Sequence, residues 1–199
     1  MGNFLEKIFG SKIEVDLVRI NLEAKLCFHE ARLDSFLSNA IFREDEDVLV
    51  KEDYTKYLQR VSVIPENCYW SLSKEIALLE EYIGFYRRVM KDKLFLKFDV
   101  KKEADKDIPA FLLFPLVTNA LLDGYNSIEK FPLKIKIRVF QTALQLEVIN
   151  HVNHHIVSQD HTIRIDRFKS RLFSCYADQP TLLFNSNSHT YKAYLQLPW

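Results

Sequence analysis

The sequence contains only four glycines in 199 residues, whereas an average protein carries about 7% glycine. They are Gly2, Gly10, Gly84 and Gly124, and no two have the spacing of a G-x-G-x-x-G turn or a G-x-x-x-x-G-K-[ST] phosphate loop. Any nucleotide chemistry therefore has to proceed without such a glycine-rich loop.

The chain also lacks an excess of charge of either sign, because 27 Lys and Arg residues balance 27 Asp and Glu residues. Broad electrostatic capture of nucleic acid normally requires a basic excess. Lys134, Lys136 and Arg138 alternate with apolar residues, which predicts the water-facing side of a strand. No aromatic residues interleave them as single-stranded nucleic-acid binding requires. We expect no nucleic-acid partner.

Long hydrophobic runs are missing as well. The longest apolar stretch, residues 108–122, is interrupted by Pro109, Pro115, Thr118 and Asn119, and it is shorter than the roughly 20 residues of a membrane-spanning helix. The N-terminal residues lack the apolar core of a signal peptide. We expect a cytoplasmic protein, or the cytoplasmic part of a membrane-associated receptor, with no membrane segment in this chain.

Cysteine and histidine give no metal site. Cys27, Cys68 and Cys175 are widely spaced and form no C-x-x-C pair, which fits reduced thiols in a cytosolic protein. The residues His151, His154 and His155 have spacings compatible with zinc on a helix, but they lie in a polar segment without a fourth ligand. A solvated loop is the prediction there.

Apolar periodicity predicts a helical hairpin over residues 1–65. The first helix carries a seam with steps of 4, 3, 4, 3 and 4, formed by Leu22, Leu26, His29, Leu33, Phe36 and Ala40. The second repeats this pattern with Val50, Tyr54, Tyr57, Val61 and Ile64, and Pro65 ends it. Such a hairpin can complete a dimeric four-helix bundle or pack on the rest of the same chain.

Residues 66–199 predict a two-layer α/β sandwich with a mixed sheet and helices on one face, so the fold class is α+β. Ser71 caps a helix that extends to Met90, and a nearly all-apolar helix from Pro109 to Leu122 is expected to be the most buried element. The other expected elements are strands at 94–100, 133–139, 144–148, 181–184 and 191–197, and a helix at 165–176.

Two runs carry a resemblance to a known family. Residues 70–88 and the run 108–124, I-P-A-F-L-L-F-P-L-V-T-N-A-L-L-D-G, resemble the region joining the histidine domain to the ATPase domain in LytS-type sensor histidine kinases. There the second run typically reads I-P-P-L-L-L-Q-P-L-V-E-N-A-I-K-H-G. Residues 22–29 resemble L-K-A-Q-I-N-P-H of that family. A later motif, R-L-x-x-x-Y, is matched by Arg171, Leu172 and Tyr176.

The resemblance implies an ATPase-like sandwich of the Bergerat type, preceded by a histidine- and dimerisation-like hairpin. It further implies that His29 is the phospho-acceptor and that Asn119 is the metal-binding asparagine of a Mg-ATP site. The implied partners are a second copy of the chain or a related kinase, bound through the hairpin, and a response regulator.

The chain departs from the family at the residues that carry catalysis. Thr118 replaces the family's glutamate and Asp123 its histidine, and Thr162 and Arg164 stand where an ATP lid has glycines. A threonine cannot act as a general base near neutral pH, and one asparagine oxygen cannot alone hold magnesium. We therefore expect Asn119 to be a non-functional remnant and the protein to bind neither cofactor nor metal.

Three hypotheses follow for function. The first is a pseudokinase that signals through protein contacts. The second is an active ATP-dependent histidine autokinase with an atypical Mg-ATP site, and the third is an ATP-independent phosphotransfer protein that uses His29. A structural alternative makes His29 a core residue of the helix interface.

Overall fold

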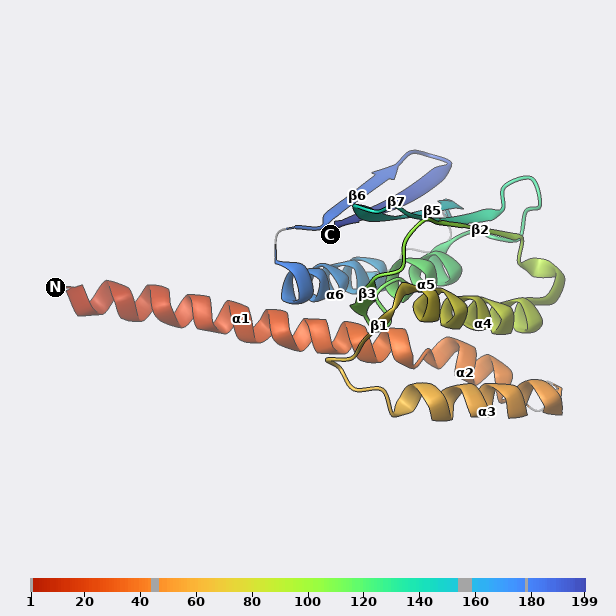
Figure 1. Ribbon diagram of the computed structural model, residues 1–199, viewed down its shortest axis with the longest axis horizontal. Helices are drawn as coiled ribbons and strands as arrows, with labels where there is room; N and C mark the ends of the chain where they lie inside the picture. The colour runs from red at the N-terminus through yellow and green to blue at the C-terminus, as the bar shows by residue number, and fades with distance from the viewer. Residues whose placement is uncertain (1, 44–46, 154–158, 178) are drawn as a thin grey trace.

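The computed structural model describes residues 2–43, 47–153, 159–177 and 179–199. A five-stranded sheet forms one layer and helices cover one of its faces, with the N-terminal helices beneath them (Figure 1). The elements are α1 (Gly2–Arg32), α2 (Ser35–Ile41), α3 (Val48–Ser62), β1 (Tyr69–Ser71), α4 (Leu72–Met90), η1 (Lys91–Lys93), β2 (Leu96–Lys102), β3 (Asp107–Pro109), α5 (Phe114–Asp123), β4 (Leu133–Val139), β5 (Ala143–His151), α6 (Gln159–Tyr176), β6 (Thr181–Ser186) and β7 (Thr190–Pro198).

The large sheet is mixed, as the sequence predicts, and its strand order is β2-β4-β5-β7-β6. Strands β2 and β4 run parallel, and the other neighbours are antiparallel. The buried side chains of β4 and β5 alternate with water-facing ones. This architecture confirms the predicted α+β fold with helices on one face of the sheet.

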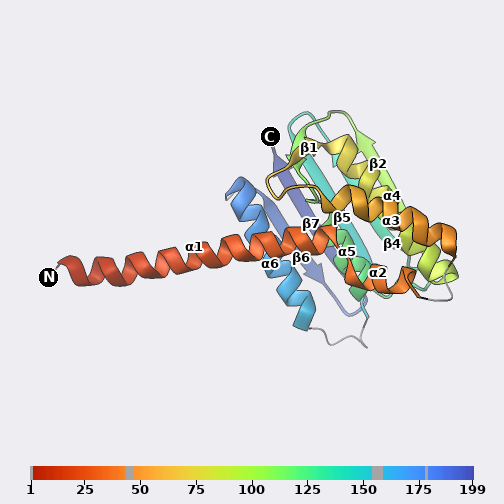
Figure 2. The ribbon, with the colours of Figure 1, turned by 90° about the horizontal axis from the view of Figure 1, so that it is seen from below.

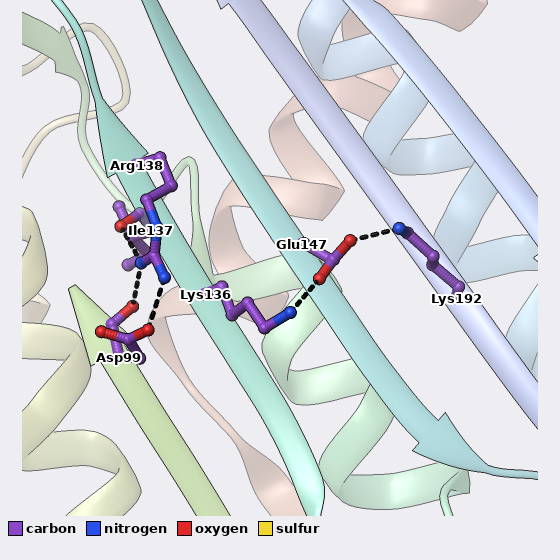
Figure 3. Close-up of polar contacts among 6 residues, drawn as sticks. All are labelled: Asp99, Lys136, Ile137, Arg138, Glu147 and Lys192. Atoms are coloured by element: carbon purple, nitrogen blue, oxygen red, sulfur yellow. Dashed lines mark hydrogen bonds and ion pairs between the residues drawn. The ribbon is translucent and has the colours of Figure 1, made fainter. Parts of the chain in front are cut away.

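The open face of the sheet carries ion pairs that bridge neighbouring strands (Figure 3). Arg138 pairs with Asp99 of β2, and Glu147 of β5 lies between Lys136 of β4 and Lys192 of β7. Basic residues predicted to face water thus lie on this face and pair with acidic neighbours.

Helix α5 lies in the core but begins later than the sequence predicts. Residues Asp107–Pro109 form β3, which pairs antiparallel with β1, so Pro109 ends a strand and does not open the helix. A buried turn over residues 110–113 follows, in which Phe111 has a φ of 59°. The left-handed conformation interrupts the apolar run, and α5 starts only at Phe114.

Two buried charged residues hold this turn from opposite sides. Glu75 of α4 accepts hydrogen bonds from the backbone N–H groups of Phe111 and Leu113, both at 2.9 Å, and from Trp70 Nε1 at 2.7 Å. Arg171 of α6 donates to the carbonyl oxygen of Ala110. Because the turn's backbone is buried, these side chains satisfy polar groups that water cannot reach. The pair is called the turn clamp below.

The N-terminal region is helical, but its first helix is broken. The backbone leaves the helix at Leu33 and Asp34, and Asp34 caps α2 by accepting from the Leu37 N–H at 2.9 Å. The single helix predicted across the seam is therefore wrong, and two helices replace it. Towards its N-terminus, α1 extends away from the rest of the protein (Figures 1 and 2).

The second predicted seam is buried on α3, through Val50, Tyr54, Tyr57 and Val61, but the seam predicted over residues 22–40 is largely exposed. Leu22, Leu26, Leu33 and Phe36 are exposed by 58%, 37%, 44% and 49%. The neighbouring face of α1 packs on α5 and α6 instead, through the buried residues Ala24, Cys27, Phe28 and Ala31. The helical region thus packs on the rest of the chain through this face, and the apolar seam of residues 22–36 is left on the surface.

No helix in the described ranges is long and apolar enough to cross a bilayer. The three cysteines carry free thiols; Cys27 is buried, and Cys68 and Cys175 are half-buried.

The turn clamp predicts a pH-dependent stability. Burial raises the pKa of Glu75 from 4.5 to about 7, against the opposing effect of its three N–H donors. From pH 4.5 to 7 the folded protein retains a proton that the unfolded chain has released, so the free energy of unfolding falls as the pH rises. This loss can reach about 3 kcal/mol. Urea unfolding at a series of pH values measures it.

Glu75→Gln supplies the comparison because glutamine does not titrate. We expect the free energy of unfolding of this variant to decrease less between pH 4.5 and 7, because the contribution of Glu75 is missing. Glu80→Gln, at an exposed position of the same helix, serves as the control and keeps the pH dependence of stability that the wild type has. Identical pH profiles for the wild type and Glu75→Gln would contradict the prediction.

Candidate functional site

Helix α5 places the residues that the resemblance assigns to nucleotide binding in the interior. Thr118 and Asn119 are both buried in the middle of this helix, and Asp123 ends it. Pro115 lies in its first turn, where the missing N–H costs no intrahelical hydrogen bond. The turn clamp fixes where the helix begins and so fixes the positions of these side chains.

Gly124 follows α5 and is required by close packing. A Cβ atom at this position would lie 2.4 Å from the Ala120 carbonyl oxygen and 2.7 Å from Asn126 Oδ1. The φ angle is −76°, so space and not backbone conformation demands glycine. The retained glycine of the family-like run therefore has a structural role here.

Arg164 of α6 occupies the polar side of α5. Its Nε donates to Asn119 Oδ1 at 3.1 Å, and its Nη2 forms a salt bridge with Asp123 Oδ2. Both partners of the salt bridge are largely buried, with side chains exposed by 24% and 18%. The amide oxygen of Asn119 thus already accepts a hydrogen bond from a permanently charged group.

The helix α6 begins earlier than the sequence predicts, at Gln159 and not at Ile165. Thr162 and Arg164 consequently lie in its first turns, so the residues expected to obstruct a phosphate-binding lid are helical. Arg164, which the sequence indicates as a steric obstacle, also forms an ion pair in the structure.

Thr118 faces a second group of polar side chains. Its hydroxyl lies 2.9 Å from the Tyr82 hydroxyl, and Tyr82 donates to Asp34 Oδ2 at 2.6 Å. Because the Tyr82 hydroxyl uses its one hydrogen to donate to Asp34, it can only accept from Thr118, so Thr118 is the donor to Tyr82. Tyr86 donates to the same oxygen of Asp34 at 2.5 Å. Burial, reinforced by the Asp34 carboxylate, raises the pKa of both tyrosines far above the usual value, which keeps their hydroxyls protonated.

A cavity of about 260 Å³ lies between the two groups, at the junction of α1 and α2 with α5 and α6. Asp34 and Thr118 line one side, and Arg164 and Arg167 the other. Arg167 pairs with Glu30 of α1. The volume is below the roughly 300–1,000 Å³ that is typical of ligand pockets.

His29 lies in a separate cluster, in the last turn of α1. Arg32 Nη2 donates to its Nδ1 at 2.9 Å, and Glu66 Oε1 lies 3.0 Å from its Nε2. Because arginine can only donate, Nδ1 carries the lone pair and Nε2–H donates to Glu66, which defines the neutral tautomer. The side chain is 43% exposed and its ring packs edge-on against Phe28. His29 and Asn119 are not brought together.

The polar segment that begins at His151 holds no metal cluster within the described ranges. His151 ends β5, where its ring stacks between Phe131 at 5.1 Å and His189 at 6.1 Å. His154 and His155 lie outside the described residues, so the loop predicted around them stays a prediction.

Asp34, Tyr82 and Tyr86 are functional-site neighbours that the sequence analysis missed. Their signals were present in the sequence: Tyr82 and Tyr86 are spaced as i and i+4 on one helix face, and Asp34 precedes a short apolar stretch as an N-cap does. Local spacing does not show that both tyrosines contact Asp34, which lies 48 and 52 residues earlier in the chain.

No family model matches the chain, and no curated protein matches it significantly. Solved structures do. The nucleotide-free catalytic domain of histidine kinase ThkA matches with a TM-score of 0.51 and 11% identity, over 66% of this chain and 97% of that one. Acinetobacter baumannii histidine kinase AdeS matches with a TM-score of 0.49 and 12% identity, over 90% of this chain and 96% of that one.

A histidine kinase from Burkholderia phymatum matches with a TM-score of 0.45 and 13% identity, over 92% of this chain and 97% of that one. At these identities the likeness concerns the fold. The match to the ThkA domain, together with the mixed sheet and the helices on one of its faces, shows that this chain has the fold of a histidine kinase catalytic domain, preceded by a helical N-terminal region.

Proposed function

We propose that this chain is a signal-transduction protein built on a LytS-type histidine kinase core, which has lost ATP binding and acts through protein contacts. The observation that carries the proposal is the contact of Arg164 with Asn119 and Asp123. Magnesium needs several oxygen ligands, and here the asparagine oxygen accepts from a guanidinium whose charge repels a divalent cation.

The environment of Thr118 supports the same conclusion. Its hydroxyl is engaged with Tyr82 in a buried network, and a hydroxyl of ordinary pKa does not abstract protons near neutral pH. Neither a metal nor a general base is therefore supplied by the α5 residues that the family uses. A protein of this kind acts by biasing the helix packing of a partner.

The first test is the thermal stability of the full chain with and without Mg-ATP. A ligand present at a hundred times its dissociation constant adds about 2.7 kcal/mol to the folded state, and we expect no shift of the melting temperature. A shift that Asn119→Ala abolishes would contradict the proposal. It would favour the autokinase alternative, in which radiolabelled ATP labels the wild type but not His29→Ala.

The phosphotransfer alternative rests on the partial exposure of the His29 ring and its neutral tautomer, which leaves a nucleophilic nitrogen lone pair facing Arg32. Incubation with a phosphorylated receiver domain tests it. The scaffold proposal predicts no transfer of phosphate to the protein. Transfer that His29→Ala abolishes and the exposed-site control His189→Ala retains would replace the scaffold by a phosphotransfer protein.

We further propose that the exposed seam is the surface through which the hairpin pairs, with a second copy or a related kinase. Exposed leucines at heptad spacing on one helix are typical of a helix–helix interface. Burial of each such side chain contributes about 1.5–3 kcal/mol.

Light scattering coupled to size exclusion tests this pairing. We expect a dimer that the double substitution Leu22→Glu with Leu26→Glu converts to a monomer, because two carboxylates per chain would then enter the interface. Leu183→Glu, at an equally exposed leucine of β6, leaves the mass unchanged. A wild-type protein that is monomeric at all concentrations would contradict homodimerisation.

A further inference from the structure

Arg171, one of the two residues of the turn clamp, has more hydrogen-bond donors than the turn uses. This side chain is 4% exposed. Its Nη2 donates to Ala110, and its guanidinium carbon lies 4.9 Å from the centre of the Phe28 ring. Its Nε is buried without an acceptor. Within the described ranges no carboxylate forms an ion pair with it.

Arg171 lines a groove of about 450 Å³ that shares no lining residue with the cavity beside Arg164. The groove lies between α1, the segment that links α3 to β1, and the C-terminal half of α6; α1 and α6 pack side by side (Figures 1 and 2). Side chains able to donate hydrogen bonds line it, and they are Asn21, Lys25, Asn67, Tyr69, Arg171 and Ser174.

The charges of the groove do not cancel. Lys25 and Arg171 are cations, and Glu66 is the acidic residue that lines the groove with them. Glu66 is already engaged, since Lys25 Nζ lies 3.5 Å from its Oε2 and His29 contacts its Oε1. No described residue that lines the groove forms an ion pair with the buried Arg171; Glu75, which acts on it electrostatically, lies outside the groove and is held by hydrogen bonds from Phe111, Leu113 and Trp70. A buried guanidinium whose Nε has no acceptor is costly.

We propose that this groove binds an anionic group, a carboxylate or a phosphate, on Arg171 and Lys25. A guanidinium recognises both groups by the same charge-assisted hydrogen bonds, and the asparagine, tyrosine and serine side chains add donors at the rim. The volume is within the range of small-molecule sites, so the ligand is a metabolite-sized anion. The inference is independent of the proposed loss of ATP binding, because the groove shares no residue with the Asn119 cluster.

The test uses two probes, inorganic phosphate and acetate, each titrated into the full chain at constant ionic strength with chloride as the balancing anion. Amide signals in ¹H–¹⁵N spectra report binding. We expect saturable shifts centred on Asn67 and Ser174, and the tighter probe identifies whether the site prefers a tetrahedral or a planar anion. Absence of saturable shifts with both probes, or shifts centred on Arg164 and Arg167, would overturn the proposal.

A matched pair of variants tests the role of charge. Ser174 is exposed on α6, so Ser174→Glu and Ser174→Gln both fold, and only the first adds a carboxylate to the groove. We expect Ser174→Glu to weaken probe binding about tenfold or more relative to Ser174→Gln, because the two side chains have the same size and only the first adds a negative charge. Equal affinity of the two variants would overturn the proposal.

Arg171→Ala is a poor probe because it also removes a contact to the turn before α5. Lys25→Gln replaces it, since Lys25 is exposed on α1. We expect weaker binding of both probes with an unchanged melting temperature in their absence. Unchanged affinity of this variant would remove Lys25 from the site and overturn that part of the proposal.

Discussion

The rest of the structure depends on the grip of Glu75 and Arg171 on residues 110–113. This turn has a left-handed residue, Phe111, and a buried backbone, so its polar groups need partners from side chains. Glu75 and Arg171 form hydrogen bonds with these groups and thereby join α4 and α6 to the start of α5. The position of α5 in turn decides where Thr118 and Asn119 lie, and Phe28 beneath Arg171 brings α1 into the same core.

The polar residues of α5 are satisfied from within the chain. Arg164 contacts Asn119 and Asp123, while Tyr82 connects Thr118 to Asp34 at the break between α1 and α2. The polar side chains of α5 are thus joined by hydrogen bonds to the junction between α1 and α2. A rearrangement of that junction has to break buried hydrogen bonds to α5, each of which costs free energy when it is left unpaired.

Much of the fold could be predicted from local patterns. Strict alternation located β4 and β5, and Ser71 with its apolar repeat located α4, because both signals depend only on residues close in sequence. The start of α5 was predicted wrongly, since a strand pairing with residues 69–71 takes up Asp107–Pro109. The seam on α1 was recognised as apolar, but its exposure was not foreseen, because periodicity shows that a stripe exists and not what covers it.

The sequence by itself determined which residue types stand where the resemblance to LytS-type kinases implies a glutamate, a histidine and lid glycines; they are Thr118, Asp123, Thr162 and Arg164. Only the tertiary structure decided that two of these residues meet: Arg164 pairs with Asp123, 41 residues earlier in the chain, and also donates to Asn119, 45 residues earlier. The physical reason is that residue identity limits which chemistry a side chain can perform, whereas the partner of a charged side chain depends on how α5 and α6 pack.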